Sequence, residues 1–327
     1  MRFVAMLHRC AVLVSIGCGL LLAAPHSAHA ITCSASMTNV VFGSVNPLSS
    51  QTDANATLNY TCTNAVGSTR SARVCFSIGD GVQGAGQTNP RQMQDGAADI
   101  LTFQLYQNAS YSTVWGSSFF GVFATPLEVL LTIAGNRSTS GTATMYGRVT
   151  NGQTTAIPGA YQDDFSGGHT ALTINEAGGS TPPGTCSSAI VDTFGFNVNA
   201  TVARQCNVSA TTLDFGTVGL LSANTPGTST IGVQCSSGSA YNVGLNQGLN
   251  GASINARKMA FGANLIGYQL YSNPGRTTVW GDTVGTNTVA GNGNGSVQNL
   301  TVYGTVPAQT TPTAGTYNDT ITVTVTY

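Results

Sequence analysis

Charged side chains are scarce in this sequence: Asp, Glu, Lys and Arg make up 7% of its 327 residues, against about 25% in an average soluble protein. With a formal net charge of −1, the chain has neither the basic face of a nucleic-acid binder nor the high net charge of a disordered protein. Histidine is also rare, because three of the four lie in the first thirty residues and leave His169 alone in the rest. We therefore predict that the protein is not an enzyme, needs no cofactor or metal and does not bind nucleic acid.

The N-terminal apolar run is shorter than the roughly 20 residues that a membrane-spanning helix needs. It covers 15 residues, 10–24, follows basic residues and ends at Pro25. Ala28 and Ala30 then supply the small side chains that a signal peptidase reads. A spanning helix is the competing interpretation. The pattern favours a signal peptide over residues 1–30, with cleavage after Ala30 and export through the periplasm.

No Cys-x-x-Cys pair is present, which argues against a zinc site. Two of the eight cysteines leave with the signal peptide. An even number remains, and in an exported chain this predicts disulfide bonds, with 15 connectivities on count alone. The remaining cysteines are Cys33, Cys62, Cys75, Cys186, Cys206 and Cys235.

The sequence contains one pattern twice. In each copy two cysteines lie 29 residues apart and a Phe-Gly pair follows the first of them: Cys33, Phe42-Gly43 and Cys62, then Cys206, Phe215-Gly216 and Cys235. Further segments repeat in the same order, among them Arg91-Gln92-Met93 with Arg257-Lys258-Met259, Phe103-Gln104-Leu105-Tyr106 with Tyr268-Gln269-Leu270-Tyr271, and Trp115-Gly116 with Trp280-Gly281. The duplication argues for disulfides Cys33–Cys62 and Cys206–Cys235, which leaves Cys75–Cys186 as a staple of the first copy alone.

Apolar and polar residues alternate with the two-residue period of β-strands, and no long stretch has a helical period. In residues 317–327, Ile321, Val323 and Val325 share one face while threonines occupy the other. Clusters of Gly, Asn and Pro separate such segments. We predict an all-β fold of two tandem immunoglobulin-like β-sandwich domains. The Pro/Gly-rich residues 178–184 suggest that the first domain ends shortly after them. The expected boundaries are residues 31–186 for the first domain, 187–205 for a linker and 206–327 for the second domain.

The second copy, from about residue 199 onward, closely resembles the spore coat protein U domain family. The resemblance rests on the cysteine and Phe-Gly spacing together with these segments: Arg257-Lys258-Met259, Tyr268-Gln269-Leu270-Tyr271, Val279-Trp280-Gly281-Asp282, Val302-Tyr303-Gly304 and Ala314-Gly315-Thr316-Tyr317-Asn318-Asp319. The first copy keeps the pattern with substitutions over residues 32–175. The resemblance implies a subunit of an archaic, Csu-type chaperone–usher pilus of a Gram-negative bacterium. A two-domain member looks like the tip adhesin, which supports attachment and biofilm formation.

In chaperone–usher systems, as the family implies, a pilin sandwich lacks one strand, and an N-terminal extension of the neighbouring subunit fills its groove. The implied partners are a periplasmic chaperone, an outer-membrane usher, an adjacent pilin and, at the pilus tip on the cell surface, an abiotic or host surface. Only Ile31 and Thr32 precede Cys33 after cleavage, so we expect this chain to accept a donor strand and to offer none. The predicted acceptor is the second domain, and the residues expected to border its groove are Ile321, Val323, Val325 and Tyr327. In the alternative interpretation the C-terminal strand completes this sandwich.

The copies differ most after their Trp-Gly pairs, where the first copy has nine more residues than the second before the sequences match again. The insertion is apolar, and loops between strands lie on the surface, so we predict an adhesive loop. Its candidate residues are Phe119, Phe120, Val122, Phe123, Pro126 and Leu127. Aromatic side chains are more often buried, which leaves core packing as the alternative, and residues 127–133 are typical of a buried strand.

Two classes of function remain open. A tip adhesin predicts neighbouring genes for a chaperone and an usher, whereas a secreted structural coat or matrix protein predicts self-assembly without them. A minor pilin away from the tip is a further alternative. His169 lies near Asp163 and Asp164 with a spacing that suits a cation, but a solvated loop is the more common explanation.

Overall fold

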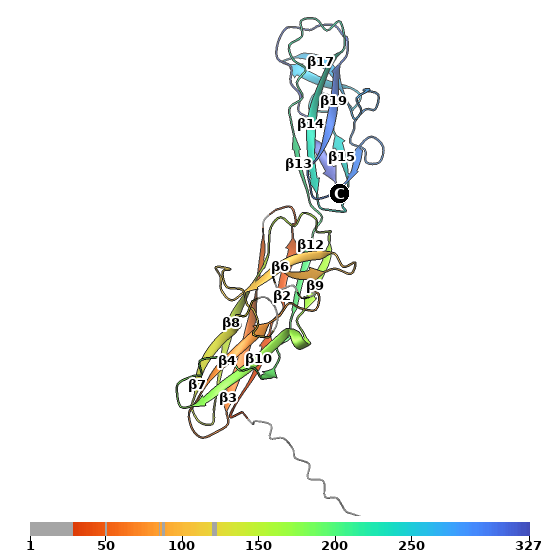
Figure 1. Ribbon diagram of the computed structural model, residues 1–327. Coiled ribbons are helices and arrows are strands. Elements are labelled where there is room, and N and C mark those ends of the chain that lie inside the picture. The colour runs from red at the N-terminus through yellow and green to blue at the C-terminus, as the bar shows by residue number, and fades with distance from the viewer. Residues whose placement is uncertain (1–28, 50, 85, 87–88, 120–122) are drawn as a thin grey trace, which may run out of the picture.

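The computed structural model describes residues 29–327 except 50, 85, 87–88 and 120–122, and the described part is almost entirely β-structure. Figure 1 shows two sandwich domains joined end to end. The predicted fold class is confirmed: the chain forms two tandem immunoglobulin-like β-sandwiches, and the C-terminal one lacks a strand. Over the described ranges, no helix has both the length and the apolar character needed to cross a membrane.

The first domain packs an eight-stranded sheet, in the order β1-β3-β8-β6-β5-β9-β12-β2, against a four-stranded sheet in the order β11-β10-β4-β7. A short 3-10 helix, η1 (Gly167–His169), connects β9 to β10. The strands are β1 (Ile31–Met37), β2 (Val40–Val45), β3 (Thr52–Asn64), β4 (Arg70–Ile78), β5 (Arg91–Gln94), β6 (Ile100–Tyr106), β7 (Leu127–Ile133), β8 (Arg137–Val149), β9 (Gly159–Asp164), β10 (Thr170–Gly178), β11 (Ile190–Asp192) and β12 (Asn197–Val202).

The second domain repeats this plan with fewer strands. A five-stranded sheet in the order β13-β14-β19-β17-β16 faces a three-stranded sheet in the order β18-β15-β20. The strands are β13 (Cys206–Ala210), β14 (Thr225–Cys235), β15 (Ala240–Leu245), β16 (Arg257–Phe261), β17 (Asn264–Tyr271), β18 (Val289–Asn292), β19 (Gln298–Val306) and β20 (Val323–Thr326).

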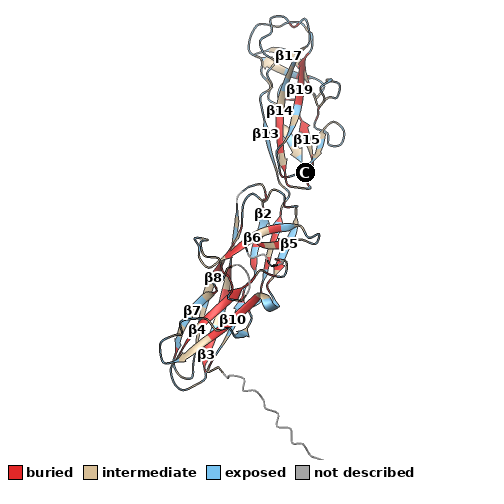
Figure 2. Ribbon diagram, viewed as in Figure 1, coloured by how far each residue is buried: buried red, intermediate tan, exposed pale blue. Residues whose placement is uncertain are grey.

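The same buried contacts organise both cores, which explains why the sequence motifs repeat. The indole N–H of Trp115 and that of Trp280 each donate to a backbone carbonyl at 2.8 Å. Beside each indole a buried arginine donates to the carbonyl of that tryptophan at 2.7 Å, Arg91 in the first domain and Arg257 in the second. A buried guanidinium is tolerated only when its N–H groups are bonded in this way. Figure 2 shows the buried positions lying along the strands of both sandwiches.

Strand β7 follows the predicted range, but it is not the buried strand that its apolar run suggests. Its residues are alternately half-buried and exposed, and Leu130 is 55% exposed while Ile133 is 3% exposed. The reason is its position at the edge of the smaller sheet, where it pairs with β4 alone. One face of an edge strand packs on the core and the other meets solvent.

Three disulfides are present among the described residues, and they join the cysteines that the duplicated spacing pairs. Cys33–Cys62 and Cys206–Cys235 each link the first strand of a domain to its neighbour in the sheet. Cys75–Cys186 occurs in the first domain alone and ties β4 to the segment between β10 and β11. This staple anchors a long connection that the second domain does not share.

Residues 187–205 do not form the linker that the sequence predicts. Strand β11 pairs with β10, and β12 lies between β9 and β2 in the larger sheet. Only residues 203–205 connect β12 to β13. The predicted boundary is wrong because the Pro/Gly-rich residues 178–184 form a connection within the first domain and do not mark its end.

The domains meet at a short junction. The amide of Gln205 donates to Ser236 Oγ at 2.8 Å, which fixes the start of the second domain. Gly295 has a φ of +78°, and a Cβ at this position would lie 2.0 Å from the carbonyl oxygen of Thr154 in the first domain. Glycine is therefore required at this contact, both for its backbone angle and for the space.

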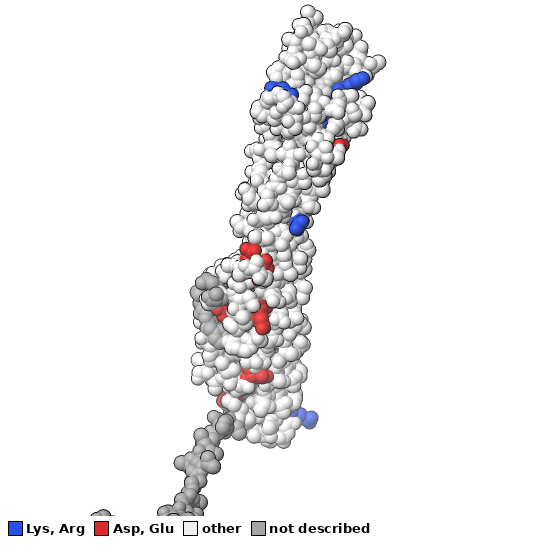
Figure 3. All heavy atoms as spheres, turned by 90° about the vertical axis from the view of Figure 1, so that its right-hand side faces the viewer, with Lys and Arg blue, Asp and Glu red and all other residues white. Residues whose placement is uncertain are grey.

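Charge is distributed unequally between the domains. Residues 31–202 carry nine acidic and five basic side chains, whereas residues 203–327 carry three acidic and four basic ones. On the face in Figure 3, most of the acidic atoms lie on the first domain and most of the basic atoms on the second. The remainder of this face is uncharged, so any partner that binds there meets mainly backbone and neutral side chains.

Candidate functional site

The second domain has an open groove of about 320 Å³ along one side of its sandwich. One wall is the segment after β13, which includes Leu213 and Phe215. The opposite wall is the segment of residues 317–321 that leads into β20. The floor is apolar and includes Ile231 and Leu270 from the larger sheet.

The equivalent position in the first domain is occupied by β12. This strand runs antiparallel to β9, with Asn197 opposite Asp164 and Val202 opposite Gly159, and parallel to β2 on its other side. Its inward side chains reach the core, where Val198, Ala200 and Val202 are 0%, 5% and 2% exposed. The first domain therefore completes its own sandwich with a strand that has no counterpart among the described strands of the second domain.

The walls of the open groove lack the regular backbone pairing found in the first domain. Residues 211–219 and 312–322 contain no strand, and their single β-bridge joins Asn318 to Ala260. Backbone N–H and C=O groups along these walls are therefore available to a strand placed between them. An extended segment that enters the groove would gain main-chain hydrogen bonds on both sides.

Apolar side chains at the groove are also more exposed than their counterparts. In the first domain Val40 is fully buried and Phe42 is 6% exposed. The matching residues Leu213 and Phe215 are half-buried, and the second domain has a smaller buried core. The groove therefore offers apolar surface that a strand with alternating apolar side chains would cover.

The residues predicted to border the groove divide into two pairs. Ile321 and Val323 line it. Val325 is half-buried in β20 opposite Val243, and Tyr327 is 48% exposed; neither lies in the groove wall. Sequence reasoning missed the other wall. The signal for that wall was present, because the Phe-Gly pair at Phe215 repeats the pair that forms β2 in the first domain.

A carboxylate, that of Asp319, lines the groove. Asp319 accepts from the Tyr268 hydroxyl at 2.6 Å and from the Leu249 amide at 2.9 Å. The pKa of Tyr268 is raised, first by burial and then by its hydrogen bond to Asp319. The matching carboxylate of the first domain is Asp163, and the residue in the place of Tyr268 is Phe103, which has no hydroxyl. The two domains therefore differ by one hydrogen bond at this position.

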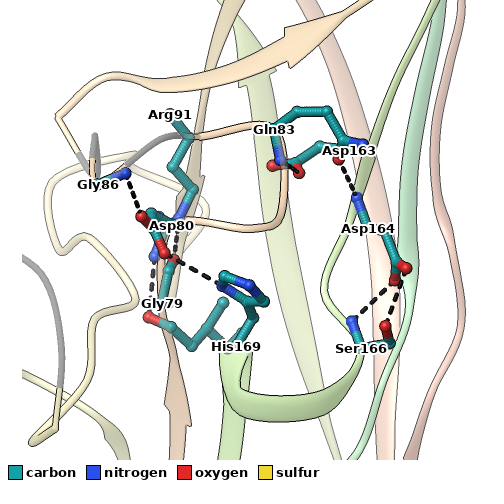
Figure 4. Close-up of polar contacts among 10 residues, drawn as sticks. Gly79, Asp80, Gln83, Gly86, Arg91, Asp163, Asp164, Ser166 and His169 are labelled. Carbon is teal, nitrogen blue, oxygen red and sulfur yellow. Dashed lines mark hydrogen bonds and ion pairs between the residues drawn. The ribbon is translucent and has the colours of Figure 1, made fainter.

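This difference leaves one oxygen of Asp163 without a partner. Asp163 is fully buried, its Oδ1 accepts from the Gln83 amide at 3.0 Å, and its Oδ2 has no hydrogen-bond partner. Burial raises its pKa to about 7, despite the opposing hydrogen bonds and the charge of Arg91. Figure 4 shows these groups together with the Asp80–His169 pair, whose atoms lie 3.1 Å apart.

The predicted adhesive loop begins beside the end of β4. The amide of Ser118 donates to Ser77 Oγ near the end of β4 at 3.3 Å, and the amide of Ser117 donates to the Phe123 carbonyl at 2.8 Å. Loop closure of the same kind occurs in the shorter loop of the second domain, where Gly281 donates to Asn287.

The candidate residues of this loop are not equally exposed. Phe119, Phe123 and Leu127 are half-buried, and Pro126 is buried. Phe120 and Val122 lie outside the described residues. The end of the first domain that is farthest from the second domain is formed by other turns (Figure 1). There the amide of Asn136 donates to the Val66 carbonyl, and the amide of Gly179 donates to the Thr69 carbonyl.

Taken together, these features define a tandem β-sandwich protein in which one domain is complete and the other is open along the equivalent groove. The Spore Coat Protein U domain family matches residues 20–166 and 192–324, and the chain belongs to this family. Protein U of Myxococcus xanthus is 32% identical over 158 residues, which are 43% of this chain and 88% of that protein.

One solved structure of a tip subunit shares the fold. The CsuC–CsuE chaperone–tip adhesion subunit pre-assembly complex, from the archaic chaperone–usher Csu pili of Acinetobacter baumannii, aligns with a TM-score of 0.52 at 17% identity over 90% of this chain and 100% of that chain. The CupB6 tip adhesin from Pseudomonas aeruginosa aligns at a TM-score of 0.36 and 11% identity over 90% of this chain and 93% of that chain, which is too distant to carry an argument.

Proposed function

We propose that this protein is the tip adhesin of an archaic chaperone–usher pilus. The observation that carries the proposal is the contrast between its two grooves: the first domain fills its groove with β12, and the second domain leaves the equivalent groove open. One acceptor groove allows attachment to one neighbouring subunit. The fold shared with a chaperone-bound tip subunit supports this role.

The first domain indicates how a donor would lie in the second. A donor placed like β12 runs parallel to residues 213–218 and antiparallel to residues 315–320. Its apolar side chains alternate, as Val198, Ala200 and Val202 do, because every second side chain of a strand points to the same face. A periplasmic chaperone supplies this strand first, and the next pilin supplies it after assembly at the outer-membrane usher.

Export and the pairing of β1 within the first domain complete the proposal. The signal peptide of residues 1–30 directs the chain to the periplasm and is removed after Ala30. The processed chain then begins at Ile31, which is the first residue of β1 and is fully buried. Since β1 pairs with β3 inside the chain's own first domain, it is not free to complement a neighbour, which supports a place at the tip of the fibre, on the cell surface.

The groove is tested by giving the second domain a strand of its own. A copy of residues 194–203 is attached after Tyr327 through a flexible Gly/Ser linker of about 20 residues. We expect the thermal midpoint of the second domain to rise by at least about 10 °C, and co-purification with the periplasmic chaperone to cease. In the matched control, the positions that copy Val198 and Ala200 become Asp. Equal thermal midpoints for the two extensions, or assembly of the unextended chain without a chaperone, would contradict the proposal.

Surface attachment is assigned to the apolar loop of the first domain. Its rings, Phe119 and Phe123, are half-buried, and many pili acting together multiply a weak contact. Phe119→Ser and Phe123→Ser are expected to reduce attachment to plastic and biofilm formation while the melting curve of the full chain is unchanged. A lowered thermal midpoint would instead identify these rings as core, and unchanged attachment would move the adhesive surface elsewhere.

A further inference from the structure

The carboxylate of Glu176 meets the start of the first strand. Its Oε2 accepts from the Ile31 backbone nitrogen at 2.8 Å, and its Oε1 accepts from the Ala30 nitrogen at 2.8 Å. These contacts join residues that are 145 and 146 positions apart. The side chain of Glu176 is 14% exposed, and Ile31 is fully buried.

The position of this carboxylate in β10 is unusual. Leu172 and Ile174 point into the core from the same face of the strand and are 0% and 1% exposed. Glu176 continues this inward face at the end of the domain farthest from the second domain. A carboxylate on an inward face is costly unless hydrogen bonds or an opposite charge compensate it.

Among the described side chains, the ion-pairing group within 4 Å of Glu176 is the imidazole of His29, whose Nδ1 lies 3.7 Å from Oε1 and which carries a charge only when protonated. His29 and Ala30 both precede the expected cleavage site. Processing therefore removes this imidazole and one of the two backbone donors. The remaining partner is the nitrogen of Ile31, which processing changes from an amide into an amine.

We propose that Glu176 is a built acceptor site for the α-ammonium group that signal-peptide cleavage creates on Ile31. This inference rests on the proposed cleavage after Ala30. In that step a water molecule hydrolyses the Ala30–Ile31 peptide bond under a signal peptidase. The water oxygen goes to the Ala30 carbonyl carbon, which leaves as a carboxylate, and the Ile31 nitrogen takes up protons to become an ammonium.

The new group fits the site better than the amides that it replaces. An ammonium has three N–H donors and a full positive charge, so it can satisfy both oxygens of Glu176 and neutralise the carboxylate. A charge-assisted hydrogen bond is roughly twice as strong as a neutral one. Because Ile31 is already held by the core and by its pairing with Asn64 in β3, the amine is positioned without further ordering. Cleavage would thus attach the new N-terminus at Ile31 to Glu176 and hold the start of β1 in place.

The chain offers an internal reference for testing this site. It contains a single lysine, Lys258, which is exposed. The processed protein therefore has two kinds of primary amine, that of Ile31 and that of Lys258. The full chain is exported with its own leader, purified with any bound chaperone, and treated with limiting N-hydroxysuccinimidyl acetate at pH 7.5. Mass spectrometry then gives the starting residue and the acetylation of each amine.

We expect the chain to start at Ile31 and its amine to react at least about tenfold more slowly, relative to Lys258, than in the urea-unfolded chain, because the carboxylate favours the charged, unreactive form. Glu176→Gln should raise the native ratio at least about tenfold. The matched control is Glu128→Gln. It removes the carboxylate on β7 that pairs with Arg73 on the neighbouring strand β4, and it should leave the ratio unchanged.

A second variant moves the amine and keeps the carboxylate. Insertion of Gly-Ser between Ala30 and Ile31 places the new amine about 7 Å farther along the chain, and its labelling should match the unfolded chain even if Glu176→Gln does not fold. If the Ile31 amine labels as fast as in urea, or if neither variant changes its labelling, the proposed acceptor site is wrong, while the proposed cleavage is not affected. A chain that starts at another residue would overturn the cleavage proposal, whereas the groove of the second domain is tested separately by its appended strand.

Discussion

The two domains share one arrangement of strands and differ in how the sandwich is completed. The first domain uses its own β12, and the second domain leaves the equivalent groove open. Both contain a disulfide between their first two paired strands, a buried tryptophan and a buried arginine that bonds to it. In the first domain the chain continues from β9 through β10 and β11 to β12. In the second domain it continues from the matching segment to β20, and the described residues contain no counterpart of β12. The presence or absence of this one strand therefore decides whether the core of a domain is closed or open.

The largest effect is expected from placing a charged side chain in β12, the strand that completes the first sandwich. Val198→Asp places a carboxylate at a fully buried position and should cost more than about 4 kcal/mol, which is enough to unfold the first domain. Thermal unfolding and limited proteolysis of the full chain measure this. Thr201→Asp, on the exposed face of the same strand, is the control and should change little. A stable Val198→Asp protein would show that β12 does not close the core.

The next effect concerns the staple that the second domain lacks. Replacing Cys75 and Cys186 by alanine opens a loop of 111 positions, for which the entropy of the unfolded chain predicts a loss of about 5 kcal/mol. Replacing Cys206 and Cys235 opens a loop of 29 positions and should cost about 1 kcal/mol less. Urea denaturation of each double variant provides the comparison, and a reversed order would mean that strain or unfolded-state structure outweighs loop length.

A smaller effect is expected from exchanging the residues that face the two matching carboxylates. Tyr268→Phe removes the 2.6 Å hydrogen bond to Asp319 and should destabilise the second domain by about 1 to 3 kcal/mol, since it leaves a carboxylate oxygen unpaired. Phe103→Tyr makes the reciprocal change and should stabilise the first domain if the hydroxyl reaches Asp163. Urea denaturation checks both, and an unchanged midpoint for Tyr268→Phe would show that water replaces the hydroxyl.

The last effect is a pH dependence confined to the first domain. The pKa of Asp163 is raised to about 7 by burial, against about 3.9 in an unfolded chain. Between these values the native state binds more protons than the unfolded state, so the stability of the first domain should fall as pH rises from about 4 to about 7 and should then level off.

The pH dependence is measured by urea denaturation at pH 5 and pH 8. Asp163→Asn should remove most of the decrease, whereas Asp319→Asn in the second domain should not. His169 pairs with Asp80, and His169→Gln therefore serves as a control that should keep the decrease. A decrease that follows His169 instead of Asp163 would assign the effect to the imidazole.

Local patterns predicted the strands well and their long-range partners poorly. Alternation identified residues 321–325 as strand-like, a near-continuous apolar run identified residues 127–133, and the repeated cysteine spacing gave the disulfides. The same alternation is visible at Val198, Ala200 and Val202, but their partners in β2 lie more than 150 positions away, and a Pro/Gly-rich connection suggested a domain end before them. The predicted linker is wrong for this reason.

The groove and the N-terminal contact show the same limit. Ile321 and Val323 were predicted because they lie in one alternating segment, whereas Leu213 and Phe215 lie about 100 positions earlier and are brought to the groove by the fold. The contact between Ile31 and Glu176 spans 145 positions and has no local signature. Sequence periodicity reports which face of a strand is buried, but not which distant segment covers it.

The three-residue connection between β12 and β13 has a mechanical consequence for the proposed tip subunit. A load that pulls the second domain away from the first reaches the first domain through the end of β12 at Val202. Because β12 is hydrogen-bonded to β9 and β2 on both sides, and the antiparallel bonds lie across the strand, tension along its axis shears many bonds at once instead of peeling them one by one. The strand that closes the first core is therefore also the part through which the domain resists extraction under flow.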